Sequence, residues 1–187
     1  MKNESRKYPR VIDSGGGQRM TLLGPRHDGG REWMDVVSEI QPGAGPPMHV
    51  HPTQDESLTV LQGRIGYIAA GQEPRFAGPG ESVTFPRGVA HRFWNAGDVL
   101  LRCEGHISPP LGFEYFMTAL YRSSSAHGGK RPGLFDLAFL LHHFESENTM
   151  VGLPAPLRKG VLPVLRTIGK VTGRYEKYRD APKNGEG

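Results

Sequence analysis

Three histidines and one glutamate in the central part of this 187-residue chain have the types and spacing of a metal site. His49 and His51 are two positions apart, so on an extended strand both side chains point to the same face. Glu56 follows shortly after, and His91 comes further along the chain. Imidazole nitrogens and a carboxylate oxygen suit a divalent iron, manganese, nickel, zinc or copper ion, and four such ligands leave coordination positions open. Open positions are what metal-dependent chemistry requires.

Glycines and prolines surround these four residues in a regular order. The first segment reads Gly43, five residues, His49-Val50-His51, four residues, Glu56, six residues, Gly63. The second reads Gly80, five residues, Pro86, one residue, Gly88, two residues, His91, three residues, Asn95. The glycines and the proline are turn residues, and the turn before His91 is expected to aim it at the other three ligands. Both segments match the two sequence motifs of the cupin superfamily, so the chain resembles a small single-domain microbial cupin.

The resemblance implies a mainly β fold, a double-stranded β-helix (jelly-roll) barrel, in which His49, His51, Glu56 and His91 hold one metal ion. It leaves the identity of the ion open. Many small cupins with these ligands are dioxygenases, whereas others are isomerases, decarboxylases, storage proteins or sensors, so the fold does not select a reaction. The resemblance and the surplus of apolar helix near the C-terminus also predict a homodimer. Catalytic residues other than the metal ligands stay unknown.

The alternation of side chains along the strands predicts what surrounds the metal. Leu58 and Val60 share the face of Glu56, and Phe93 shares the face of His91, so these three residues are the expected lining of a substrate pocket. Three neutral imidazoles and one carboxylate leave a divalent ion with a net charge of about +1 in apolar surroundings, which favours anionic oxygen ligands. The expected ligand is therefore a small, oxygen-rich or aromatic molecule.

Short strands are predicted on both sides of these residues, at 19–23, 32–40, 57–61, 65–69, 82–85, 90–94 and 99–107, with a polar loop at 26–31. Their regular spacing favours an antiparallel sandwich or barrel over a parallel α/β sheet. In the last strand, the apolar side chains are expected to point inward and the polar ones outward. The inward set is Leu101, Cys103 and Ile107, and the outward set is Glu104 and His106.

We divide the chain into a flexible N-terminal arm (1–17), a cupin barrel (18–112) and a C-terminal α-helical extension (113–187). Residues 113–121 and 134–144 have apolar residues at helical spacing, and the second helix is apolar around most of its circumference, so it must be buried. His142 and His143 lie on this helix. Adjacent residues point about 100° apart on a helix, so we expect these two to pack or cap rather than to share a metal.

Residues 156–178 predict a basic amphipathic helix that Pro163 kinks or restarts. Its expected apolar stripe consists of Leu157, Val161, Leu165, Ile168 and Thr172. Residues 156–187 hold 8 Lys/Arg and 3 Asp/Glu, so the excess positive charge of the chain lies in this tail. Such a helix can bind a membrane surface or an acidic partner, but packing on its own protein is the simpler expectation.

Composition limits the class of protein further. The 26 glycines and 16 prolines suit many short strands joined by tight turns. Residues 1–112 carry 12 Lys/Arg and 12 Asp/Glu, so no nucleic-acid surface is expected on the barrel. Cys103 is the single cysteine and the N-terminus lacks an apolar signal segment, which together predict a cytoplasmic protein. No segment approaches the ~18 apolar residues of a membrane-spanning helix.

Two functional hypotheses follow. The first is a metal-dependent enzyme, dioxygenase-like and oxidative, with a small-molecule substrate. The second is a non-catalytic module that binds or senses a small molecule, and a metal-dependent isomerase or decarboxylase is a further alternative. Open coordination argues against a purely structural ion, because structural zinc sites are usually closed by four ligands with cysteine prominent.

Overall fold

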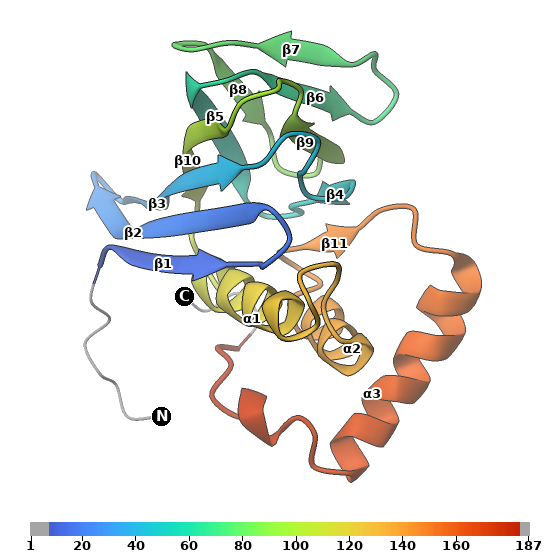
Figure 1. Ribbon diagram of the computed structural model, residues 1–187. Helices are drawn as coiled ribbons and strands as arrows, with labels where there is room; N and C mark the ends of the chain where they lie inside the picture. The colour runs from blue at the N-terminus through green and yellow to red at the C-terminus, as the bar shows by residue number, and fades with distance from the viewer. Residues whose placement is uncertain (1–7, 184–187) are drawn as a thin grey trace.

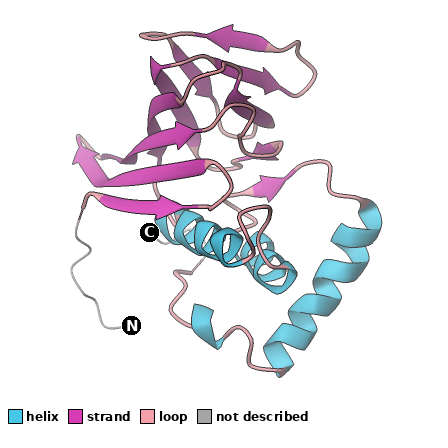
Figure 2. Cartoon of the chain, viewed as in Figure 1, coloured by secondary structure: helices cyan, strands magenta, loops and turns pink. Residues whose placement is uncertain are grey.

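Two antiparallel sheets form the upper part of the molecule in Figure 1, and helices lie below them. The computed structural model describes residues 8–183. The larger sheet has the strand order β1-β2-β3-β10-β5-β8, with the strands Arg10–Asp13, Gln18–Asp28, Arg31–Ile40, Leu101–Ser108, Asp55–Gln62 and Ser82–Phe85. The smaller sheet has the order β11-β4-β9-β6-β7, with the strands Thr149–Met150, His49–Val50, His91–Asn95, Ile65–Ala69 and Arg75–Ala77. This arrangement confirms the predicted double-stranded β-helix with C-terminal helices (Figure 2).

The core of the barrel lies between the two sheets and follows from the alternation of side chains along each strand. On β5, Leu58 and Val60 are buried, and their neighbours are more exposed. Burying each such side chain stabilises the fold by about 1.5–3 kcal/mol. The other members of this cluster are Ile40, Ile65, Ala77, Val83, Phe85, Phe93, Leu101 and Cys103.

The predicted inward and outward faces of β10 are confirmed. Leu101, Cys103 and Ile107 are buried. Glu104 and His106, which face the other way, are only partly buried. His106 Nδ1 lies 2.5 Å from Asp35 Oδ1 of β3, on the outer face of the sheet. Burial raises the pKa of the Cys103 thiol to about 12, so this cysteine is an unreactive core residue.

Helix α1 (Phe113–Ala126) covers the part of the larger sheet that the smaller sheet leaves uncovered (Figure 1). Phe113 and Tyr121 of α1 join a second apolar cluster, which also contains Ile12, Met20, Leu22, Met34, Val36 and Ile107. Polar contacts fix the helix against β1, because Arg10 contacts Glu114 Oε1 at 2.8 Å and donates to Thr118 Oγ1 at 2.6 Å. The larger sheet of the barrel and α1 of the helical extension therefore share this second apolar cluster.

The remaining helices pack below α1. Helix α2 (Leu134–His143) and the residue after it bury Leu140 and Phe144 fully, and Phe116 of α1 contacts them. A π-helical turn (Leu157–Val161) leads into α3 (Leu162–Val171), and a short 3₁₀ helix (Glu176–Tyr178) follows. Pro163 lies in the first turn of α3, and the residues before it keep helical backbone angles, so the chain passes from the π-helical turn into α3 without leaving the helix. None of the helices between residues 8 and 183 is long and apolar enough to cross a membrane.

The structure corrects two details of the sequence-based prediction. The polar segment 26–31 is not a loop, because β2 continues to Asp28 and β3 begins at Arg31, with only Gly29 and Gly30 in the turn. Both glycines have positive φ, and the ion pair between Arg26 and Asp35 joins the two exposed strands. Polar side chains on both faces of a projecting hairpin resemble a loop in the sequence.

The second correction concerns the apolar stripe of the C-terminal helix. The buried residues of α3 are Leu162 and Gly169, whereas the predicted stripe members Val161, Ile168 and Thr172 are exposed. Gly169 faces the Tyr175 ring, and a Cβ atom at position 169 would lie 2.4 Å from that ring. The face of α3 that packs on the protein is therefore the one that carries Gly169. A small residue thus forms the contact surface, which apolar periodicity does not reveal.

Of the predicted flexible arm, residues 1–7 lie outside the described part of the chain. The rest of the arm contains β1, whose residues pair with β2 in the register Arg10↔Leu22 to Asp13↔Arg19. The boundaries that we assigned to the three regions stay predictions.

Candidate metal centre

The four predicted ligands meet inside the barrel. One ligand atom from each of His49, His51, Glu56 and His91 lies within 4.8 Å of all the others, and all four residues are buried. Strand pairing brings them together, because His49 of β4 is opposite His91 of β9, and Glu56 comes from β5 in the facing sheet. Within residues 8–183 this His/Glu cluster is the one group of His, Cys, Asp and Glu side chains suited to hold a metal ion.

Backbone carbonyls orient all three imidazole rings in the same sense. His49 Nδ1 donates to Pro47 O at 2.9 Å, His91 Nδ1 to Val89 O at 2.8 Å, and His51 Nδ1 to Glu147 O at 3.0 Å. A carbonyl oxygen only accepts, so each Nδ1 carries the proton and each Nε2 offers a lone pair. Metal-binding histidines are held in this way by second-shell acceptors.

The three Nε2 atoms converge on one carboxylate oxygen. Glu56 Oε2 lies 2.8 Å from Nε2 of His91, 3.7 Å from that of His51 and 4.0 Å from that of His49. Neutral rings and an ionised carboxylate would bring four acceptors together without a donor, which is unfavourable in a buried site. The cluster therefore requires a positive charge at its centre, either a shared proton or a metal cation, and its donor set fits a metal cation.

The electrostatic surroundings favour the metal-binding protonation states of His49 and Glu56. Burial lowers the pKa of His49 from 6.5 to about 4, although the charge of Glu56 opposes this, so the ring is neutral at pH 7. Burial by itself raises the pKa of Glu56, but the proximity of the three imidazole rings, that of His91 above all, outweighs it, and the net shift is downward. Neutral imidazoles and an ionised carboxylate are what a divalent ion needs.

The cluster lies at the boundary between the two apolar clusters of the interior. Glu56 is paired with Phe85 on one side, a residue of the barrel core, and with Ile107 on the other, a residue that contacts α1. The Phe85 ring stacks on His91, with centroids 4.0 Å apart and an angle of 3° between the planes. An apolar wall of this kind keeps water away from the ligands.

The three residues predicted to line a substrate pocket lie in the barrel interior. Leu58, Val60 and Phe93 all belong to the apolar core between the sheets, on the strands that carry Glu56 and His91. Their contact with a substrate stays a prediction. The adjacent histidines of α2 form no metal site: His142 is paired with Glu145, and His143 donates to Pro182 O and stacks on Phe139.

Sequence reasoning missed the support that the C-terminal extension gives to the site. Met150 of β11 pairs with His49, and the carbonyl of Glu147 accepts the bond from His51 described above. Thr53 also donates to Ser146 O at 2.9 Å. No sequence signal identifies these partners, because they act through their backbones and lie about 100 positions from the ligands that they support.

Tyr121 of α1 was also missed as a neighbour of the cluster. Its side chain belongs to the same apolar cluster as Ile107, the residue paired with Glu56. Burial raises the pKa of its phenol, and the negative charges of Asp13 and Glu56 add to the effect. Tyr121 is thus a buried, neutral phenol on which the charge of Glu56 acts, although in the sequence it is only one of the apolar residues of a helix.

Comparison with known proteins agrees with this geometry. The family model described as the cupin domain matches residues 36–103. The polyketide synthase CurC of Streptomyces cyaneus is 32% identical over 110 residues, which cover 54% of this chain and 70% of that protein. The oxidoreductase iacF of Pestalotiopsis fici is 42% identical over 50 residues, which cover 27% of this chain and 24% of that protein. Among solved structures, KdgF from Halomonas sp. is similar at 22% identity with a TM-score of 0.46, over 58% of this chain and 92% of that one.

Fold and site together define a jelly-roll barrel with a buried His/Glu cluster that is typical of a cupin metal site. The chain belongs to the cupin superfamily. The matched region spans only about a quarter of the length of iacF, so the similarity concerns the barrel and not that whole protein.

Proposed function

We propose that this cupin is a metal-dependent, dioxygenase-like enzyme for a small oxygen-rich or aromatic molecule, and that His49, His51, Glu56 and His91 bind one divalent ion. The observation that carries the proposal is the convergence of three Nε2 atoms and one carboxylate oxygen without a donor among them. When bound, the ion supplies a Lewis acid with open positions for anionic oxygen groups, and iron(II) would add the capacity for oxidation.

The residues around the cluster support this kind of substrate. Leu58, Val60 and Phe93 provide apolar surface on the strands of Glu56 and His91, which suits a flat or partly apolar molecule better than a sugar. The name of iacF is that of an oxidoreductase and the name of CurC is that of a polyketide synthase, and polyketides are rich in ketone and phenol oxygens. We propose a cytoplasmic homodimer as the working form.

Metal analysis tests the first half of the proposal. The protein is purified without a nickel column and its metal content is measured by mass spectrometry, for the wild type and for His51→Ala. We expect about one ion per wild-type chain and only traces in the variant. Equal metal content in the two proteins would contradict the assignment of the ligands.

Oxygen uptake tests the second half. Protein reconstituted with iron(II) without air is mixed with catechols, phenols and β-diketones, and oxygen consumption is followed with an electrode. We expect uptake with at least one class for the wild type and none above background for His51→Ala, with unchanged circular dichroism. Full metal occupancy without uptake for any class would leave metal binding intact and exclude the oxidative reaction.

A second candidate function is a non-catalytic binding or sensing module, which the bond between His51 and the Glu147 carbonyl of the extension favours. In this case a ligand at the metal would be retained without turnover, and the extension would report its presence. Hydrogen exchange in residues 113–183 distinguishes the two: a change in protection on ligand binding without product formation supports sensing. A metal-dependent isomerase or decarboxylase would instead form product without oxygen uptake.

A further inference from the structure

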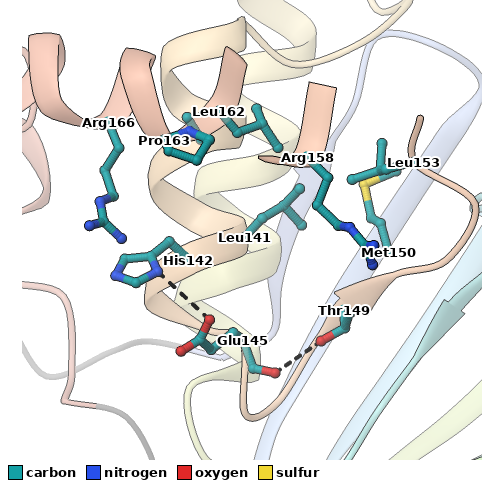
Figure 3. Close-up of a pocket in the computed structure, with 11 residues that line it drawn as sticks. Leu141, His142, Glu145, Thr149, Met150, Leu153, Arg158, Leu162, Pro163 and Arg166 are labelled. Carbon is teal, nitrogen blue, oxygen red and sulfur yellow. Dashed lines mark hydrogen bonds and ion pairs between the residues drawn. The ribbon is translucent and has the colours of Figure 1, made fainter. Parts of the chain in front are cut away.

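A cavity lies in the helical extension, and the His/Glu cluster does not line it. It has a volume of about 390 Å³ and is formed by α2, the segment around β11 and the start of α3 (Figure 3). This volume is within the range of small-molecule sites. The apolar part of its lining consists of Ala138, Leu141, Met150, Leu153, Leu162 and Pro163.

Two arginines flank this apolar surface. Arg158 and Arg166 line the cavity from opposite sides, with the side chain of Leu141 between them in the view of Figure 3. Neither guanidinium group forms an ion pair or hydrogen bond with any residue between 8 and 183. Glu145, which also lines the cavity, lies 3.7 Å from His142, and Thr149 donates to Glu145 O at 3.0 Å. Two arginines and one glutamate leave the cavity with a net positive charge.

The chemistry of this lining specifies a class of ligand. An apolar surface binds a hydrocarbon or aromatic body, and a guanidinium group pairs with a carboxylate through two parallel hydrogen bonds. A simple inorganic anion would leave the apolar surface exposed, and a neutral hydrocarbon would leave the two arginines unpaired. A molecule with both parts satisfies the whole cavity.

The cavity also shares a strand with the metal centre. Thr149 and Met150 line it and form β11, and Met150 is paired with His49. Val151 N donates to Met48 O at 2.9 Å on the same strand pair. A ligand that contacts Met150 from the cavity side therefore presses on the backbone that positions His49, and through the segment of Glu147 it reaches His51.

We propose that this cavity binds an amphipathic carboxylate, that is, an apolar molecule with one carboxylate group, and that its occupancy changes metal affinity through β11. The first part is independent of the function proposed above, and the second rests on metal binding by the His/Glu cluster. By thermodynamic linkage, a carboxylate that alters metal affinity must have its own affinity altered by the metal to the same extent.

Octanoate is a suitable probe because it combines the two parts of the ligand and remains soluble. The metal-free wild type is titrated with octanoate and followed by calorimetry and by amide NMR. We expect saturable binding, with signal changes concentrated in residues 138–166. Replacing both guanidinium groups, Arg158→Gln with Arg166→Gln, should weaken binding about tenfold, since two exposed ion pairs are lost.

The matched control replaces two cations of the same segment that do not line the cavity, Lys159→Gln with Lys170→Gln, and should leave octanoate affinity unchanged. Octan-1-ol, which has no charge, should bind the wild type and the arginine variant equally. Equal octanoate affinity in the arginine and lysine variants, or signal changes that leave out residues 138–166 altogether, would overturn the site, whereas additional changes in β4 are expected from its pairing with β11.

Coupling to the metal centre is measured separately, from the affinity for manganese(II) by electron paramagnetic resonance with and without saturating octanoate. We expect a shift in affinity of about fivefold or more. An unchanged affinity would overturn the coupling through β11. Failure to bind manganese at all would contradict the proposed metal binding by the His/Glu cluster. The octanoate titration of the metal-free protein would still test whether the cavity binds a carboxylate.

Discussion

The barrel and the helical extension differ in how tightly the sequence specifies them. In the barrel, turn glycines, alternating strands and four ligands define a single arrangement, and the His/Glu cluster has a backbone acceptor for every ring. In the extension, α3 buries little more than Leu162 and Gly169 and exposes a row of valine and isoleucine side chains. The buried His/Glu cluster thus lies in the barrel, which the sequence specifies tightly, and the open cavity lies in the loosely packed helical extension.

Under the two proposals made above, this difference corresponds to two roles, a catalytic metal site in the barrel and a ligand cavity in the extension. A catalytic metal site needs fixed ligands, because small displacements cost large factors in rate. A binding site that signals occupancy needs an element that can move, and such elements come from regions with few buried contacts. The changes below test whether the two parts respond separately, in order of decreasing effect.

Glu56→Gln should have the largest effect, and only in the barrel. The substitution keeps the shape of the side chain but replaces the carboxylate by an amide, whose N–H can donate to the Nε2 atom of His91. We expect metal affinity to fall more than about a hundredfold. The free energy of unfolding of the metal-free protein should stay the same or rise. Calorimetric titration with metal and urea unfolding without metal measure the two quantities, and a variant that is unfolded without metal would contradict the proposed lack of a donor.

Phe144→Ala should act mainly on the extension. Phe144 is fully buried between α1 and α2, and removing such a ring costs about 3–5 kcal/mol of stability. We expect faster hydrogen exchange across residues 113–183, with slow exchange retained in β5 and β10. If the exchange of β5 and β10 accelerates to the same extent, the two parts unfold as one unit and the contrast between them fails.

Acid should loosen the C-terminal tail before it affects the barrel strands. Asp136 accepts hydrogen bonds from Ser123 at 2.6 Å and contacts Lys177 Nζ at 2.5 Å. Burial raises the pKa of Asp136, but these two partners lower it more, so it lies below its ordinary value of 3.8. The ionised carboxylate therefore stabilises the fold above about pH 4, and this contribution, about 1 kcal/mol, is lost as the pH falls through the lowered pKa. Hydrogen exchange of residues 172–183 between pH 5 and pH 3 should show the loss in the wild type and not in Asp136→Asn.

Val171→Ser should have the smallest effect. The Val171 side chain is 81% exposed, so its replacement should change the free energy of unfolding by less than about 0.5 kcal/mol. Thermal unfolding of the two proteins measures this difference. A loss of more than about 1 kcal/mol would mean that the exposed side of α3 is covered in solution, as it would be in the proposed dimer.

The sequence predicted the site better than it predicted the extension, and the reasons are physical. His49, His51, Glu56 and His91 were recognised because metal coordination and tight turns demand particular residue types at fixed separations. The prediction of a loop at 26–31 was wrong, because the charged residues of a hairpin that is exposed on both faces give no period-two pattern. Glu147 and Met150, which hold His51 and His49 in place, were not predicted for another reason. They act through backbone atoms, which every residue type has, so the sequence carries no signal for them.

The short strand β11 has a consequence for the order in which the protein is made. Its residues, Thr149 and Met150, pair with β4 and complete the edge of the smaller sheet next to His49. During synthesis the ribosome releases the motif residues long before these two, so the nascent barrel has an unpaired edge at β4, and unpaired edges promote aggregation. We expect the finished site to form only after β11 has left the ribosome, so the proposed metal would be bound after residue 150 has emerged.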